Sequence, residues 1–157
     1  MKITFVNIGS TQEEYLRKGI DIFGKRIEKY APFSMICLNE PKNLRNLPEN
    51  MQKEAEGRLI MPAIEKADRK ILLDVTGRQM NSESFAKLLQ QYMNMGTRNL
   101  AFIAGGPYGF SDEVYQKVGE RISLSAMTFS HQMVRLIFME QLYRAFTIIK
   151  GEPYHHA

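Results

Sequence analysis

The sequence predicts a parallel α/β sheet covered by helices on both faces. Short apolar runs alternate with longer amphipathic segments, which is the order expected of strand–helix–strand units. The run Lys70–Val75 is largely apolar without polar alternation, as expected for a strand buried on both faces. The chain has 157 residues, of which 44% are hydrophobic. We therefore expect one domain over residues 1–157.

Five strands are expected, and each is followed by a segment with helical spacing. The strands are predicted at 3–8, 33–38, 70–75, 99–104 and 121–125, and the helices at 10–30, 49 to about 67, 82–95, after Ser111, and about 131–150. The predicted N-terminal caps are Ser10 paired with Glu13, Asn81 or Ser82, and Ser111. Gly96 is a predicted C-cap, Pro62 predicts a kink or an early helix end, and Thr76–Gln79 is predicted to be a turn.

Composition excludes several protein classes. No apolar run approaches the roughly 20 residues that span a bilayer, and the apolar N-terminal run is too short for a signal peptide, so no membrane partner is expected. Cys37 is the only cysteine, which excludes an internal disulfide and suits a cytoplasmic protein. The net charge of +4 is compatible with an RNA partner but does not require one.

The last predicted helix is apolar around its whole circumference between Met133 and Ile149. Such a helix must be buried on all sides, and a chain of this size offers little interior for a terminal helix. We therefore expect one side to pack on the sheet and the other on a second subunit, as in a two-fold homodimer. A central core helix within one subunit is the alternative.

The glycine-rich segment Gly105–Gly109 follows a predicted strand and precedes a short helix. Glycine permits close backbone approach, so main-chain groups here could bind a nucleotide-like ligand. The segment lacks the spacing of a P-loop or a dinucleotide fold, and a tight turn without a ligand is an equal interpretation. Ligands of parallel sheets bind beyond the carboxyl ends of strands, which also directs attention to residues 74–78 and 126–131.

Polar residues near the C-terminus complete the candidates. Arg144 lies four residues after Glu140, so an ion pair on one helix face is expected. Tyr154, His155 and His156 lie among the last four residues of the sequence. No cysteine or carboxylate cluster with ligand spacing accompanies these histidines, so no metal site is predicted.

Together these residues resemble a known family. The segments that carry the resemblance are Leu72–Asp74, Gly105–Gly109, Leu124–His131, Leu142–Phe146 and Pro153–His156. They are similar to those of the ribosomal RNA large subunit methyltransferase H family, a minimal member of the SPOUT class, and the similarity covers the whole chain. It implies a parallel-sheet SPOUT methyltransferase fold with a C-terminal trefoil knot over about residues 70–157.

The resemblance also implies a cofactor and a set of binding residues. S-adenosyl-L-methionine is the implied methyl donor. By position, its contacts are Leu73, Gly105, Leu124, Ser125, Ala126, Met127, Thr128 and Phe129.

The implied reaction is methylation of N3 of a pseudouridine in 23S rRNA of the assembled ribosome, by a homodimer. The resemblance places Arg144, Tyr154 and His155 near this substrate, with the tail close to the partner's cofactor. N3 carries an imide proton that must leave, and a histidine can accept a proton near neutral pH. The resulting hypothesis makes His155 the base, Tyr154 the residue that positions the nucleotide, and Arg144 the residue that grips phosphate or a base carbonyl.

Two alternative functions fit the sequence less well. A non-catalytic ribosome-binding factor with the same fold would bind ribosomes without transferring a methyl group. An oxidoreductase or another nucleotide-dependent α/β enzyme is the second alternative, and the absence of a dinucleotide fingerprint after the first strand, at Asn7–Thr11, weighs against it.

Overall fold

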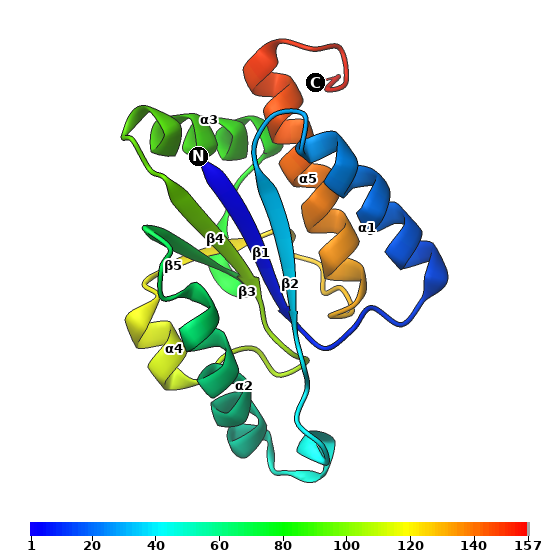
Figure 1. Ribbon diagram of the computed structural model, residues 1–157, viewed down its shortest axis with the longest axis vertical. Coiled ribbons are helices and arrows are strands. Elements are labelled where there is room, and N and C mark those ends of the chain that lie inside the picture. Colours follow the sequence, from blue (N-terminus) through cyan, green and yellow to red (C-terminus); the bar gives the residue numbers. More distant parts are fainter. Residues whose placement is uncertain (157) are drawn as a thin grey trace.

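The chain folds into a parallel sheet with helices on both faces, as predicted. The computed structural model describes residues 1–156, and within them the sheet has five strands in the order β2-β1-β4-β3-β5 (Figure 1). The strands are β1 (Lys2–Ile8), β2 (Phe33–Leu38), β3 (Arg69–Gln79), β4 (Asn99–Ala104) and β5 (Glu120–Ser123). The helices are α1 (Glu14–Ile27), α2 (Glu49–Ile64), α3 (Ser82–Asn94), α4 (Asp112–Lys117) and α5 (Met133–Lys150), with a 3-10 turn at Leu44–Asn46.

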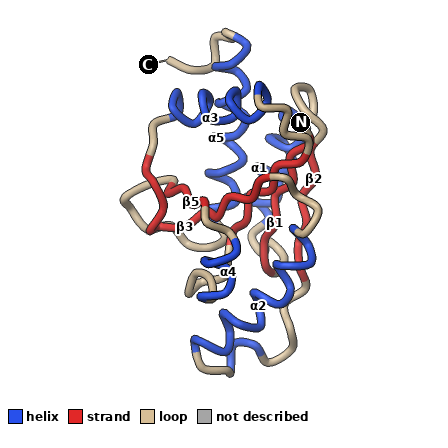
Figure 2. Tube along the Cα trace, turned by 90° about the vertical axis from the view of Figure 1, so that its left-hand side faces the viewer, coloured by secondary structure: helices blue, strands red, loops and turns tan. Residues whose placement is uncertain are grey.

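The helices form two layers around the sheet. Helices α1, α3 and α5 cover one face, and α2 and α4 cover the other (Figure 2). Strand β1 shows the alternation that this requires, because Ile3 and Phe5 pack toward the first layer whereas Val6 and Ile8 pack toward the second. Both faces are apolar, which explains the nearly continuous hydrophobic runs in the sequence.

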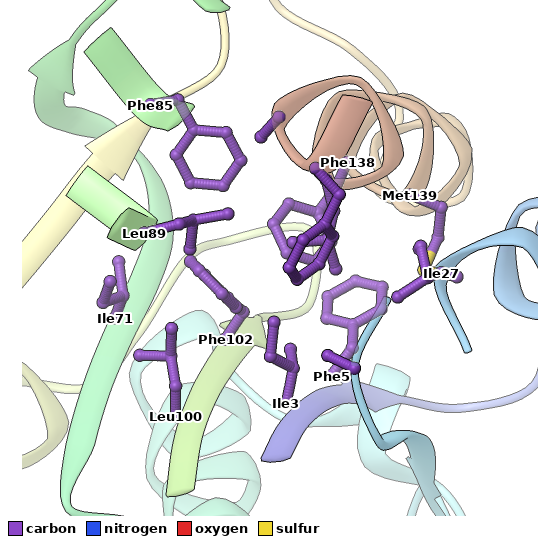
Figure 3. Close-up of a cluster of buried hydrophobic side chains, with 14 of the residues drawn as sticks. Ile3, Phe5, Ile27, Ile71, Phe85, Leu89, Leu100, Phe102, Phe138 and Met139 are labelled. Carbon is purple, nitrogen blue, oxygen red and sulfur yellow. The ribbon is translucent and has the colours of Figure 1, made fainter. Parts of the chain in front are cut away.

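The larger core lies under α5. Phe138 of this helix is fully buried between Phe5 of β1 and Phe102 of β4, with ring centroids 4.6 and 4.8 Å away (Figure 3). Phe85 of α3 packs edge-on against Phe102. The last helix therefore closes the core over β1 and β4, two paired strands that are far apart in the sequence.

Most of the predicted helix ends are confirmed. The Asn81 side chain accepts a hydrogen bond from the Ser84 backbone amide at 2.8 Å, and Ser111 caps α4 through the Val114 amide. Gly96 has a φ of +76° just beyond α3, as expected of a glycine after a helix C-terminus. Helix α2 ends at Ile64, two residues after Pro62 and earlier than the predicted residue 67.

Two local predictions are wrong. Helix α1 begins at Glu14, not at Ser10, and the Ser10 hydroxyl accepts a hydrogen bond from the Gln12 side chain in place of capping the helix. The segment Thr76–Gln79 belongs to β3 and is not a turn. Its glycine suggested a turn, but Gly77 marks a place where two strands approach closely.

A bulge in β3 shapes the region beyond the strand ends. Ile122 of β5 pairs with both Leu73 and Arg78, so the residues between these two leave the ladder. A Cβ on Gly77 would lie 2.6 Å from the backbone of Ile122, which explains why a residue without a side chain is needed there. The bulge takes residues 74–77 out of regular pairing with β5, although Gly77 still lies against the β5 backbone.

No helix within the described residues 1–156 is both long and apolar enough to cross a membrane.

Candidate cofactor cleft and C-terminal tail

The carboxyl ends of β3, β4 and β5 surround a cleft. It has a volume of about 560 Å³, which is within the range of ~300–1,000 Å³ typical of small-molecule sites. Three segments line it: residues 73–76 from β3, residues 104–110 after β4, and residues 128–134 before and in α5. A smaller cavity of about 70 Å³ adjoins it and shares Leu73, Asp74, Val75, Phe129 and Val134. The three loops predicted from the sequence therefore do meet.

The structure brings together seven of the eight predicted cofactor residues. Leu73 and Phe129 line both cavities, Gly105 and Thr128 line the larger, and Leu124, Ser125 and Met127 line the smaller. Ala126 lines neither cavity but lies between residues that do. The Ser125 hydroxyl accepts a hydrogen bond from the Met127 backbone amide at 2.9 Å, which fixes the turn of this loop.

An ionised carboxylate, Asp74, lies on the wall of the cleft. It accepts hydrogen bonds from the Tyr115 hydroxyl at 2.6 Å and from the Thr76 backbone amide at 2.8 Å. Burial alone would raise the pKa of Asp74, but the hydrogen bonds from Thr76 and Tyr115 outweigh it and hold the pKa below its usual value. Burial and the bond to Asp74 raise the pKa of Tyr115 to about 12. The cleft therefore contains a fixed negative charge.

A second carboxylate supports the glycine loop from behind. Glu56 of α2 is buried, accepts a hydrogen bond from the Gly106 backbone amide at 3.2 Å, and contacts the Arg45 guanidinium at 3.3 Å. A Cβ on Gly106 would collide with this carboxylate. Glycine at 106 is needed so that the backbone can reach Glu56. Burial raises the pKa of Glu56, although the contacts with Arg45 and Gly106 oppose the rise.

Replacing Glu56 with glutamine should change how stability depends on pH. The pKa of Glu56 is raised by folding, so this group stabilises the fold below its unfolded pKa of ~4.3, and that contribution is lost as pH rises through the folded pKa. Glu56→Gln should remove the decrease in stability that accompanies rising pH, because glutamine does not ionise. The glutamine side-chain oxygen can still accept the hydrogen bond from Gly106. Urea unfolding at pH 4 to 7 measures the difference from wild type, and Glu54→Gln on an exposed position of α2 is the control. Equal pH profiles for the two variants would contradict the assignment.

The start of α5 adds a histidine and a buried arginine. Arg135 is 1% exposed and donates to the Ile8 carbonyl at 2.6 Å and to the Thr11 hydroxyl at 3.0 Å, so it ties α5 to the end of β1. His131 lines the cleft, and burial together with Arg135 lowers the pKa of His131. A largely neutral histidine there adds no positive charge to the cleft.

The residues Arg144, Tyr154 and His155 lie together at the other end of α5. Glu140 accepts hydrogen bonds from Arg144 Nη2 at 2.5 Å and from the Tyr154 hydroxyl at 3.2 Å. The Arg144 guanidinium lies over the Tyr154 ring at 4.9 Å, and its Nη1 is 3.4 Å from His155 Nδ1. Burial and then Glu140 raise the pKa of Tyr154. The predicted Glu140–Arg144 ion pair is confirmed, and it organises the tail.

Within one chain, the tail cluster does not reach the cleft. Val134 lines the cleft and Arg144 follows it by ten residues on the same helix, which is a rise of about 15 Å. The tail, residues 151–156, follows the end of α5 that lies opposite the loops of the cleft (Figure 1). The two groups of predicted residues therefore lie apart within one subunit.

Sequence reasoning missed Glu56 and Tyr115 as parts of the site, and it included His131 only as the last residue of the loop 126–131. Glu56 lies fifty residues before its partner Gly106, in the middle of a helix, and no local pattern marks it. Asp74 was predicted only as the start of a loop, whereas the structure places it within β3, where the bulge after Leu73 begins.

Comparison with known proteins identifies the family. A family model described as "Predicted SPOUT methyltransferase" matches residues 1–155. Curated relatives named ribosomal RNA large subunit methyltransferase H are 51% identical in Christiangramia forsetii and in Flavobacterium psychrophilum, each over 99% of both chains.

Solved structures show the same fold at low identity. A probable methyltransferase from Bordetella pertussis Tohama I has a TM-score of 0.58 at 10% identity, over 92% of this chain and 93% of that one. A probable methylase family protein from Haemophilus influenzae Rd KW20 has a TM-score of 0.56 at 10% identity, over 99% of this chain and 70% of that one. With its parallel sheet and its cleft beyond β3, β4 and β5, the chain belongs to the SPOUT methyltransferase family.

Proposed function

We propose that this protein methylates N3 of a pseudouridine in 23S rRNA of the assembled ribosome, with S-adenosylmethionine as the methyl donor. The relatives that match the whole chain are named ribosomal RNA large subunit methyltransferase H, which supports a substrate in the large ribosomal subunit. The observation that carries the proposal is the pair of adjoining cavities, both lined by Leu73 and Phe129, that brings the Gly105 loop and the 124–129 loop together. A ribosomal substrate implies a cytoplasmic location.

The cleft fits the cofactor of the family. Leu73, Phe129 and Val134 provide apolar surface for an adenine ring, and the backbone groups of the glycine loop provide hydrogen bonds. The ionised Asp74 complements a positively charged ligand. Bound S-adenosylmethionine supplies an activated methyl group, so the protein must mainly orient the base nitrogen and remove its proton.

We further propose that the active form is a homodimer in which the tail of one subunit meets the cleft of the other. This arrangement would unite the two groups of residues that one chain keeps apart. Exposed apolar side chains surround the cleft: Val75 is 71% and Met127 is 76% exposed. Such residues usually indicate a covered surface, and several apolar residues of α5 are only partly buried. One domain over 1–157 and a knot within about residues 70–157 belong to the same proposal.

The tail residues receive separate roles in the proposed reaction. His155 accepts the N3 proton, Tyr154 positions the nucleotide, and Arg144 binds a carbonyl or phosphate oxygen beside it. Glu140 holds the Arg144 and Tyr154 side chains in one arrangement. Orientation of this kind lowers the entropic cost of reaching the transition state.

The decisive experiment compares ribosomes with and without the protein. Mass spectrometry of 23S rRNA from a strain that lacks the protein should show one pseudouridine without its methyl group. Purified protein, S-adenosylmethionine and those ribosomes should restore it. An unchanged nucleoside profile would exclude the proposed substrate, and binding without transfer would support the alternative of a non-catalytic ribosome-binding factor.

Filling the glycine loop should abolish cofactor binding. A Cβ on Gly105 would lie 3.1 Å from the Gly109 carbonyl and 3.2 Å from the Phe110 ring, so Gly105→Val must displace the loop or fill the cleft. Calorimetric titration with S-adenosylmethionine should show affinity at least about 100-fold weaker, the decrease expected when a preorganised pocket is blocked. Gly119→Val is the control, because no atom lies within 4 Å of a Cβ at Gly119. If Gly105→Val bound S-adenosylmethionine with wild-type affinity, the cofactor site would not include this cleft.

A further inference from the structure

Two arginines lie at the tail end of α5, and their surroundings differ. Arg144 is 24% exposed, and its Nε and Nη2 both donate to Glu140. Its positive charge is therefore compensated within the subunit. The second arginine, Arg26, lies in the last turn of α1, which runs beside α5 (Figure 1).

Arg26 is held by aromatic rings and not by a carboxylate. Its guanidinium carbon is 5.4 Å from the ring centroids of both Phe23 and Tyr143. The residue is exposed, and no Asp or Glu oxygen within residues 1–156 lies within 4.0 Å of its nitrogens. A guanidinium over aromatic rings keeps its edge N–H groups available for a planar, bidentate contact with an anion.

The same aromatic ring connects Arg26 to the tail. Tyr143 packs edge-on against Tyr154 with ring centroids 4.7 Å apart, and it also contacts Phe23. Arg26 is close enough to Tyr154 to oppose the rise in the pKa of that hydroxyl, which burial and Glu140 cause. Arg26 is therefore connected to Tyr154, the residue proposed to position the nucleotide, through the Tyr143 ring that both contact.

We infer that Arg26 is a substrate-binding residue that grips an RNA phosphate next to the target nucleotide. Arg144, whose charge Glu140 neutralises, then positions the tail and contacts the base. This assignment rests on the proposed function. From the sequence alone, both the phosphate and the base carbonyl were possible contacts of Arg144, and the structure separates them: Arg26 binds the phosphate and Arg144 contacts the base. A phosphate contributes more binding free energy when it pairs with an exposed cation that has no carboxylate partner than when it pairs with a cation already bound to a carboxylate.

Ribosome binding at several salt concentrations tests this division. Removing a single phosphate interaction should make the slope of log affinity against log salt less steep by about 0.7–0.9. Arg26→Ala should show this change and bind ribosomes about fivefold more weakly, because a phosphate contact contributes to affinity regardless of sequence. Arg26→Lys should keep the salt slope but recover only part of the affinity, because lysine cannot form the bidentate contact.

The matched control is Lys25→Ala, which removes the same charge from the neighbouring residue. Lys25 faces the groove between α1 and β2, about 100° around the helix from Arg26. The slope of log affinity against log salt for Lys25→Ala should equal that of the wild type. S-adenosylmethionine affinity and sedimentation as a dimer, measured in parallel, show whether Arg26→Ala only disturbs the fold.

The outcomes separate this inference from the proposed function. A wild-type salt slope in Arg26→Ala, or the same change in Lys25→Ala, would overturn the phosphate contact. Ribosome binding is measured without methyl transfer, so it tests the role of Arg26 independently of the proposed reaction. If the protein binds ribosomes but transfers no methyl group, the methyltransferase proposal is refuted, and the salt slope of Arg26→Ala still shows whether Arg26 contacts a phosphate.

Discussion

Replacing His155 with alanine should lower the rate of methyl transfer by about 10²- to 10⁴-fold, the usual contribution of a general base. Affinity for S-adenosylmethionine should change little, because His155 lines neither cavity of its own subunit and, where the tail meets the partner's cleft, it is assigned to the N3 proton and not to the cofactor. Single-turnover methylation of ribosomes measures the effect. His156→Ala is the control, since that neighbouring side chain is exposed. A wild-type rate of methyl transfer by His155→Ala at neutral pH would show that His155 is not the general base.

Mixing two inactive variants should restore activity if the tail acts on the partner subunit. His155→Ala keeps a sound cleft, and Gly105→Val keeps a sound tail. In a mixed dimer, one of the two composite sites is complete. Random exchange of subunits should therefore give about a quarter of the wild-type rate. A mixture as inactive as its parents would show that cleft and tail serve the same chain.

The second large effect concerns stability. Phe138→Ala should lower the free energy of unfolding by about 3–5 kcal/mol, because it leaves a cavity between two rings that cannot collapse onto it. Phe5 and Phe102, the two residues that would border the cavity, belong to the central strands and have little freedom to move. Urea unfolding at fixed protein concentration measures the change.

Met51→Ala is the control for this substitution. Met51 is 50% exposed on α2, on the opposite face of the sheet, and its truncation should change stability by no more than about 0.5 kcal/mol. A decrease of less than about 1 kcal/mol in Phe138→Ala would mean that the core relaxes around the missing ring.

The sequence predicted the strands well because burial on both faces leaves a strong pattern. The apolar runs around Phe5, Leu72 and Phe102 each became a central strand. Local caps such as Asn81 and Ser111 were also predictable, because the cap and its amide lie three residues apart. Predictions from the sequence pattern failed where the local structure depends on a segment that is distant in the sequence. Gly77 suggested a turn, since nothing nearby in the sequence shows that the β5 backbone passes beside it.

The same limit applies to the site. Leu73, Gly105 and the 124–129 loop follow strands, so topology places them together once the sheet is known. The role of Glu56 beneath Gly106 depends on the packing of α2, which no periodicity reveals. Arg144 and Glu140 are four residues apart and were predictable as a pair. Arg26 contacts Tyr143 across two helices, and only coordinates could show that it has no carboxylate partner within residues 1–156.

The position of β1 affects how the protein is made. This first strand hydrogen-bonds on one side with β4, whose pairing begins at Asn99, almost a hundred residues later. Its inner face is then covered by Phe138, close to the end of the chain. A nascent chain still attached to its ribosome cannot bury Phe5 until α5 has left the exit tunnel, and contacts so distant in sequence form slowly. The core under α5 therefore closes late, once residues 133–150 are available to cover β1.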